Sequence, residues 1–169
     1  MNGHPGGLEH TRRLLELSGL HCGARILDMG AGGGEAVTLL RSLGYDAAGV
    51  DLEPRSAIVQ KGNMLHTAFE SGSFDGILSQ CAFYVSGDVP GALAEAKRLL
   101  RPGGVLLLSD VFFEEPEGLA EQAGFALIHK EDLTALWREY YLEALWRGEA
   151  DSCAGRGKGS YWLLICIKE

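Results

Sequence analysis

The sequence predicts a doubly wound α/β fold, with helices on both faces of a mostly parallel sheet. Strand-like apolar runs alternate with helix-like segments, and the first strand ends in a glycine-rich turn that opens a helix. The chain contains neither an internal repeat nor a low-complexity tract. We therefore expect a single domain over residues 1–169, made of a helical segment at 1–20 and a sheet core at 21–169.

In the first half of the chain, residues 8–20 place leucines at helical spacing between polar residues, which predicts an amphipathic helix. The other elements expected there are strands at 25–29, 45–51 and 57–60 and a helix at 35–42. Residues 52–56 are fewer than the roughly dozen residues that a parallel crossover usually takes. We therefore expect a shortened helix between the second and third strands, and the alternative is that the third strand lies elsewhere than at 57–60. The thinly covered sheet face that results would favour a homodimer.

The second half of the chain continues the alternation of strands and helices. The expected strands are at 74–79, 105–110, 125–129 and 161–168, and the expected helices are at 89–100, 117–123 and 132–146. The sequence Arg-Pro-Gly-Gly at 101–104 predicts a turn, and the glycine-rich stretch at 155–160 predicts a loop before the last strand.

Composition narrows the function classes. Of the 169 residues, 46% are hydrophobic and 22% are charged, which is typical of a globular protein, and the apolar runs are too short to span a membrane. The first residues are neither basic nor apolar, so we expect no secretory signal and a cytoplasmic location. The net charge of −8 disfavours nucleic acid as a partner. The four cysteines are scattered without a CxxC pair, so we expect no metal site.

The glycine-rich turn after Asp28 is a candidate ligand site, because glycines let the backbone turn sharply and let a ligand approach it closely. A dinucleotide fingerprint would need glycine at position 35, where Glu35 stands, and a carboxylate there is poorly placed beside a pyrophosphate. A ligand with an ammonium and a sulfonium would tolerate these acidic surroundings. A purely structural turn is the alternative.

Asp51 closes the second expected strand. A carboxylate at that position can accept hydrogen bonds from both hydroxyls of a ribose. It can also cap the following turn, and the two roles are compatible.

Several motifs, in order and at fitting distances, resemble those of class I S-adenosylmethionine-dependent methyltransferases. They are Ile26–Glu35, Gly49–Asp51, Gly62–Met64, Gly72–Ser79 and Leu99–Leu106. The resemblance runs from about residue 8 to the C-terminus and is greatest to the small-molecule enzymes of quinone biosynthesis and of the arsenite type. It implies a Rossmann-like seven-stranded sheet with the last strand antiparallel. It also implies methyl transfer from S-adenosylmethionine to a small-molecule acceptor, leaving S-adenosylhomocysteine.

The resemblance also implies roles for individual residues around the cofactor. The glycine-rich turn would line its methionine and ribose portions through Gly30, Ala31, Gly32 and Gly34. Asp28 would lie near the methionine amine, Asp51 would hold the ribose and Leu52 would pack on the adenine. Asn63, which stands where the family commonly has aspartate, would reach the adenine amino group, and the Met64 backbone would contact the ring nitrogens. Ser79 and Gln80 would face the methyl-bearing end, and the segment at 1–20 would cover the site.

The acceptor should bind outside the carboxyl ends of the strands. We consider His10 as a general base because imidazole titrates near neutrality, Tyr84 as an orienting group and Asp110 as a second polar group at a strand end. Their alternatives are an exposed histidine at a helix start, a packing aromatic and a capping carboxylate. Phe83, Tyr84, Phe112 and Phe113 would together suit an aromatic or apolar acceptor.

Other functions stay open at this point. Residues 79–82 lack the Asn/Asp-Pro-Pro-Tyr pattern associated with methylation of amino groups in bases and proteins, which disfavours an RNA or protein methyltransferase. The cysteines lack the pattern expected for arsenic methylation. A non-catalytic module that binds S-adenosylmethionine or a nucleotide and serves a partner protein is a further alternative, as is an NAD-dependent enzyme.

Overall fold

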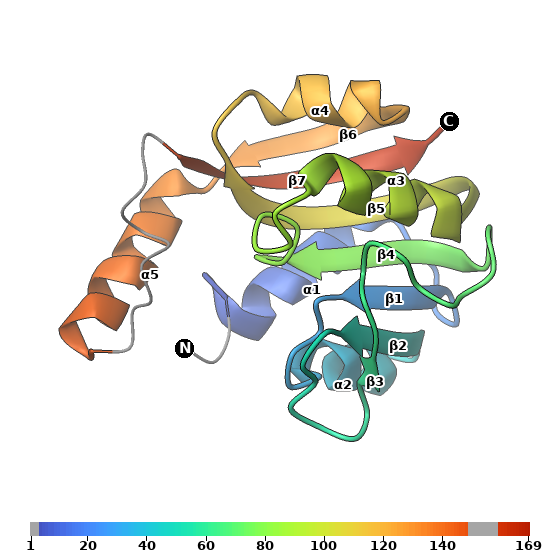
Figure 1. The fold of residues 1–169 in the computed structure, drawn as a ribbon, viewed down its shortest axis with the longest axis horizontal. Helices are drawn as coiled ribbons and strands as arrows, with labels where there is room; N and C mark the ends of the chain where they lie inside the picture. The colour runs from blue at the N-terminus through green and yellow to red at the C-terminus, as the bar shows by residue number, and fades with distance from the viewer. Residues whose placement is uncertain (1–3, 149–158) are drawn as a thin grey trace.

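The computed structural model describes residues 4–148 and 159–169 and contains one seven-stranded sheet in the order β3-β2-β1-β4-β5-β7-β6 (Figure 1). The strands are β1 (Arg25–Met29), β2 (Asp46–Asp51), β3 (Gln60–Lys61), β4 (Phe74–Gln80), β5 (Leu100–Phe112), β6 (Phe125–Asp132) and β7 (Ser160–Lys168). The pairs from β3 through β5 are parallel, whereas β7 runs antiparallel to both β5 and β6. The predicted sheet, with its antiparallel last strand, is confirmed.

Helices cover both faces of the sheet, as predicted. On one face, α1 (Gly7–Ser18) and α2 (Glu35–Ser42) bury Leu14, Leu15, Val37 and Leu40 against the strands. On the other face, α3 (Val89–Leu99) and α4 (Pro116–Gln122) bury Ala92, Leu93, Ala96 and Ala120. Each helix therefore has an apolar side that meets the sheet.

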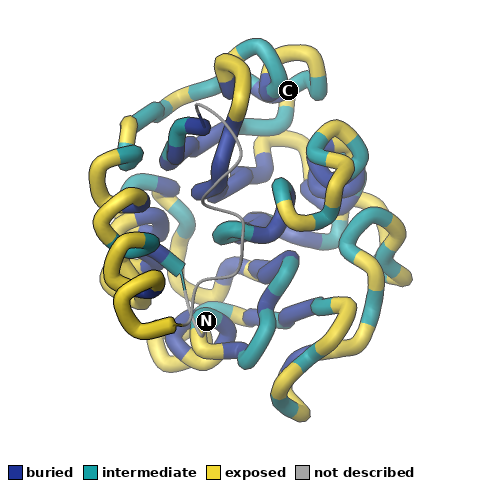
Figure 2. Tube along the Cα trace, turned by 60° about the vertical axis from the view of Figure 1, so that its left-hand side comes forward, coloured by how far each residue is buried: buried dark blue, intermediate teal, exposed yellow. Residues whose placement is uncertain are grey.

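The last helix, α5 (Thr134–Trp146), lies at one end of the sheet and is largely exposed (Figures 1 and 2). It contacts the body mainly through Trp137, which packs with Val111 of β5 and Tyr161 of β7. The predicted helix at 132–146 starts too early, because β6 extends to Asp132. No helix among residues 4–148 and 159–169 is both long and apolar enough to cross a membrane.

The connection from β2 to β3 corrects the sequence prediction. The expected strand at 57–60 is misplaced, because β3 comprises only Gln60–Lys61, and residues 52–59 form bends and turns instead of a shortened helix. The strand was predicted from an apolar run that includes Val59. This residue is buried in the same core cluster as Val37 and Ala47, so it packs against the face of the sheet and does not pair with β2.

Two further predictions are affected by the structure. The turn at 101–104 lies within β5, where the pairing with β4 shifts between Phe74 and Gly76. The loop predicted at 155–160 and Cys153 lie outside the described residues, except for Gly159 and Ser160.

Candidate functional site

Two adjoining hollows lie at the carboxyl ends of β1, β2 and β4, on the side where the glycine-rich turn leads into α2. The first is lined by His4, Gly7, Leu8, Asp28, Gly30, Ala31, Gly32, Glu35, Ala36, Arg55 and Gln80. The second is lined by Gly30, Gly32, Asp51, Leu52, Arg55, Asn63, Met64, Leu65, Gln80, Cys81, Ala82, Val85 and Ser86. Because the two share Gly30, Gly32, Arg55 and Gln80, they form one elongated site along the sheet edge.

The glycine-rich turn is the floor of this site. Gly30 and Gly32 have left-handed backbone conformations, with φ of 86° and 51°. A Cβ atom at Gly30 would collide with the side chain of Ala82, so any other residue would push the β4 loop away. The turn is held to the neighbouring strand because the N–H groups of Gly30 and Ala31 both donate to the Val50 carbonyl. Gly34 lies outside both linings and precedes α2.

Asp28 makes the first hollow acidic. It is buried at the end of β1, and burial raises the pKa of its carboxyl to about 7, with a further rise from the negative charges of Asp51 and Glu35. A group that brings a positive charge into this hollow would stabilise the ionised carboxylate.

Asp51 lines the second hollow and is hydrogen-bonded to the glycine-rich turn. One carboxylate oxygen accepts from the N–H of Gly32 at 2.8 Å, and the other accepts from the N–H of Glu53 at 2.9 Å. The predicted capping role is therefore present. Each oxygen keeps a lone pair for a ligand hydroxyl, so the ribose role is compatible with it.

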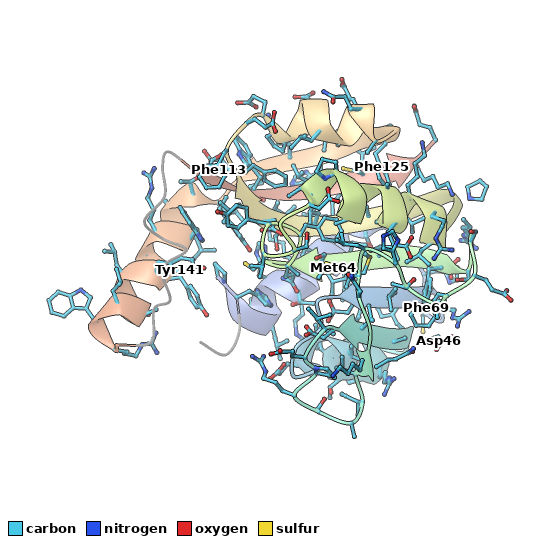
Figure 3. All side chains as sticks on the ribbon, viewed as in Figure 1. Asp46, Met64, Phe69, Phe113, Phe125 and Tyr141 are labelled. Carbon is cyan, nitrogen blue, oxygen red and sulfur yellow. The ribbon has the colours of Figure 1, made fainter. Side chains whose placement is uncertain are left out.

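The second hollow has an apolar wall. Leu52 leaves 64% of its surface exposed, and Met64, which is labelled in Figure 3, lines the same hollow. The side-chain oxygen of Asn63 accepts from the N–H of Leu65 at 2.9 Å. One of its two lone pairs is therefore used within the loop, and one is left for the adenine amino group.

Gln80 lies where the two hollows meet, but Ser79 does not line them. Ser79 is fully buried and donates to the Met29 carbonyl at 2.9 Å, because alternate residues of β4 point to opposite faces of the sheet. The prediction that Ser79 faces the site is corrected accordingly. Gln80 accepts from the Thr11 hydroxyl at 2.8 Å and has its amide nitrogen 3.3 Å from Nδ1 of His4, so it anchors the N-terminal segment beside the site.

The three residues considered for catalysis are not among those that line the two hollows. His10 is only 6% exposed and is on the side of α1 that faces α5, where burial lowers its pKa to about 4. Asp110 is buried and accepts from the N–H groups of Phe83, Tyr84 and Val111, so it matches the capping alternative. Neither His10 nor Asp110 lines the two hollows, and a role of either in acceptor binding stays a prediction.

Tyr84 matches its packing alternative, with its ring 5.3 Å from that of Phe113. Phe83 and Phe112 are buried in the core, so only Tyr84 and Phe113 of the expected aromatic wall reach the surface. Cys81 has a left-handed backbone with φ of 57°, and burial raises the pKa of its thiol above the usual range. It is therefore a poor nucleophile.

Arg55, which borders both hollows, escaped the sequence prediction. His4 borders the first hollow and belongs to the N-terminal segment expected to cover the site, although no local motif singles it out. The short connection after Asp51 is the signal that points to Arg55, because a chain that skips a helix must pass close to the glycine-rich turn.

A family model described as a methyltransferase domain matches residues 27–108, which include the glycine-rich turn, Asp51 and β4. An uncharacterized methyltransferase, YodH, of Bacillus subtilis is 28% identical over 76% of this chain and 63% of its own length. An arsenite methyltransferase of Aquipseudomonas alcaligenes is 30% identical over 53% of this chain and 33% of its own length. A demethylmenaquinone methyltransferase of Tropheryma whipplei is 27% identical over 60% and 48%. The chain thus spans less than two thirds of each of these relatives.

Solved structures share the fold. Phosphoethanolamine N-methyltransferase 2 of Haemonchus contortus, in complex with S-adenosyl-L-methionine, superposes with a TM-score of 0.76 at 21% identity, covering 98% of this chain and 53% of that one. The [4+2]-cyclase SpnF superposes with a TM-score of 0.76 at 17% identity, covering 95% and 80%. The matched domain lies within the sheet, and over residues 27–108 the chain is similar to the methyltransferase domain.

Proposed function

We propose that this protein binds S-adenosylmethionine in the two joined hollows and transfers its methyl group to a small-molecule acceptor. One observation carries the proposal: Asp28, the glycine-rich turn and Asp51 follow one another along a single elongated site. This order suits an ammonium, the chain that carries the sulfonium and the ribose hydroxyls in turn. The apolar second hollow, with Leu52 and Met64, suits a purine ring.

The residues present fit this cofactor. Asp28 would hold the ammonium, the backbone from Gly30 to Gly32 would accommodate the chain, and Asp51 would hold the ribose. When bound, the cofactor supplies a methyl carbon already activated by a sulfonium. The task of the protein is then to position the acceptor in line with that carbon and to exclude water, which contributes about 7–11 kcal/mol at most.

The acceptor would approach over the segment from Cys81 to Ser86, which forms the outer wall of the second hollow. His4 takes the place that the sequence suggested for His10, because it lines the first hollow beside Gln80. Burial lowers the pKa of His4, so its imidazole is neutral near pH 7 and able to accept a proton.

A second function is favoured by a separate observation. None of His10, Tyr84 and Asp110 lines the hollows, so none of them offers a general base there, and a module that binds the cofactor without catalysis is the second candidate. The cyclase SpnF shares this fold, and a fold by itself does not fix an activity.

Transfer of label from methyl-labelled S-adenosylmethionine distinguishes these functions. The protein is incubated separately with a small-metabolite extract, total RNA and a protein extract, and Asp51→Ala is the control. We expect label only in small metabolites, and only with the wild-type protein. Label in RNA or protein would contradict the acceptor class, and cofactor binding without any labelled product would favour the non-catalytic module.

A further inference from the structure

We propose that Arg55 binds the α-carboxylate of the cofactor and so makes the site selective for an intact amino-acid moiety. The inference rests on the proposed function and adds a specificity-determining residue to it. Its basis is the position of one arginine over the glycine-rich turn, the charges around that position and the way the chain reaches it.

The guanidinium of Arg55 lies directly over Gly32. A Cβ atom built on Gly32 would be 2.8 Å from the Nη2 atom of Arg55, so glycine at this position is what gives the guanidinium its place. The contact is reinforced by the backbone, because the N–H of Arg55 donates to the Gly32 carbonyl at 3.0 Å. Arg55 therefore borders both hollows at the point where they join.

The short connection between β2 and β3 produces this arrangement. Residues 52–59 contain no helix and lie against the turn, with Ile58 and Val59 filling the space above Gly34. Val59 is buried and pins the connection, while Arg55 stays exposed. The chain thus carries a cation to the cofactor side of the turn.

The other charged side chains that line the first hollow are acidic, so Arg55 is the group there that can bind an anion. Asp28 and Glu35 are acidic, and the pKa of His4 is lowered by burial. Among the described residues that line this hollow, Arg55 is the one side chain with a permanent positive charge. No described carboxylate forms an ion pair with it, whereas Arg13, Arg98 and Arg101 each have such a partner.

A zwitterionic amino acid needs both signs of charge from its site. The Asp28 carboxylate would bind the ammonium. The guanidinium of Arg55 has two parallel N–H donors that match the two oxygens of a carboxylate. The neutral backbone groups of the turn cannot supply this positive charge.

Calorimetric titration with three ligands tests the assignment. S-adenosylmethionine carries the carboxylate, its decarboxylated analogue lacks only that group, and methylthioadenosine lacks the whole amino-acid portion. Each is titrated into the wild-type protein, into Arg55→Met and into Arg12→Met, which makes the same charge change at an exposed position outside both hollows.

We expect Arg55→Met to weaken binding of S-adenosylmethionine about tenfold, the scale of one charge-assisted pair. Its affinities for the decarboxylated analogue and for methylthioadenosine should not fall, and Arg12→Met should bind all three ligands as the wild type does. Unchanged binding of methylthioadenosine also shows that the variant is folded.

Two outcomes overturn the inference alone. Equal losses for all three ligands would mean that Arg55 shapes the turn without recognising the carboxylate, and unchanged affinities would mean that it does neither. If the wild-type protein binds none of the ligands, the proposed function fails as well.

Discussion

Two buried carboxyl groups at strand ends have different partners in this molecule. Asp28 opens onto the first hollow among other acids, and its pKa is raised to about 7. Asp110 is surrounded by backbone N–H groups of the β4–α3 loop and of its own strand. Burial raises the pKa of Asp110 to about 6, although the N–H groups oppose the rise. The first carboxyl suits a ligand, and the second holds a loop.

Cofactor affinity should depend on pH through Asp28. Only the ionised carboxylate attracts an ammonium, and a pKa of about 7 leaves the carboxyl mostly protonated at pH 6. Affinity for S-adenosylmethionine should therefore fall about tenfold between pH 8 and pH 6. Asp28→Asn should bind weakly at both pH values. A wild-type affinity that does not change over this range would contradict the assignment.

The raised pKa of Asp28 makes the stability of the free protein fall as the pH rises, whereas the affinity for the cofactor increases. The folded state holds the Asp28 proton more tightly than the unfolded chain, whose carboxyl has the ordinary value of 3.8. This group therefore favours folding at low pH, and its contribution is lost as the pH rises through about 7. Comparing urea unfolding of the wild type and Asp28→Asn between pH 5 and pH 8 measures the difference, which should grow with pH in favour of the variant.

Removing Asp110 should destabilise the fold without removing the cofactor site. Asp110→Ala leaves buried N–H groups of Phe83, Tyr84 and Val111 without an acceptor, and we expect a loss of about 3 kcal/mol in urea unfolding. Asp110→Asn keeps one acceptor oxygen and should lose less. Unchanged stability in the alanine variant would show that these contacts contribute nothing.

His4 and His10 provide a matched pair for testing proton transfer. His4 lines the first hollow, whereas His10 is buried beside α5. Once an acceptor is known, His4→Ala should lower kcat about 10²-fold, and His10→Ala should leave it nearly unchanged. A larger loss in the His10 variant would restore the original assignment.

At the scale of elements, the connection between β2 and β3 differs from the prediction. Its bends replace a helix, and a single buried valine covers the sheet where that helix would lie. The sequence predicted the shortness of the connection correctly from the distance between apolar runs. It could not separate an apolar residue in a strand from one that packs beneath the sheet, since both are buried.

The contribution of that valine can be measured. Val59 is 5% exposed and Ile58 is 40% exposed, so the two neighbours differ in burial more than in chemistry. Val59→Ala should reduce the free energy of unfolding by about 2 kcal/mol, and Ile58→Ala by about 0.5 kcal/mol. Equal losses in urea unfolding would mean that the connection is not pinned by Val59.

At the scale of the whole molecule, the alternation of strands and helices predicted a mostly parallel sheet, whereas the antiparallel last strand was predicted by the resemblance to methyltransferases. The rule that ligands bind beyond the carboxyl ends of parallel strands located Asp28, Asp51 and Gln80 beside the hollows. The environments of His10 and Asp110 could not be predicted, because their partners lie far away in the sequence. His10 borders a hollow that Leu136 of α5 also lines, and Asp110 accepts from the N–H groups of residues 83 and 84.

The homodimer stays a prediction, and the structure weakens its original reason. The sheet face expected to be bare is covered by Val59 on one side and by Met64, Leu65 and Phe69 on the other. Light scattering measures the molar mass in solution and so tests the prediction. The mass of a dimer would mean that two copies associate through another apolar surface, and the mass of a monomer would contradict the prediction.

Binding of the cofactor is the central claim. The most direct measurement is calorimetric titration of the protein with S-adenosylmethionine, S-adenosylhomocysteine and NAD, with Asp51→Ala as the control. Micromolar binding of the first two ligands, absent for NAD and lost in the variant, is the result predicted here. Failure of the wild-type protein to bind either sulfur ligand would contradict the account and leave the sheet and its hollows without this function.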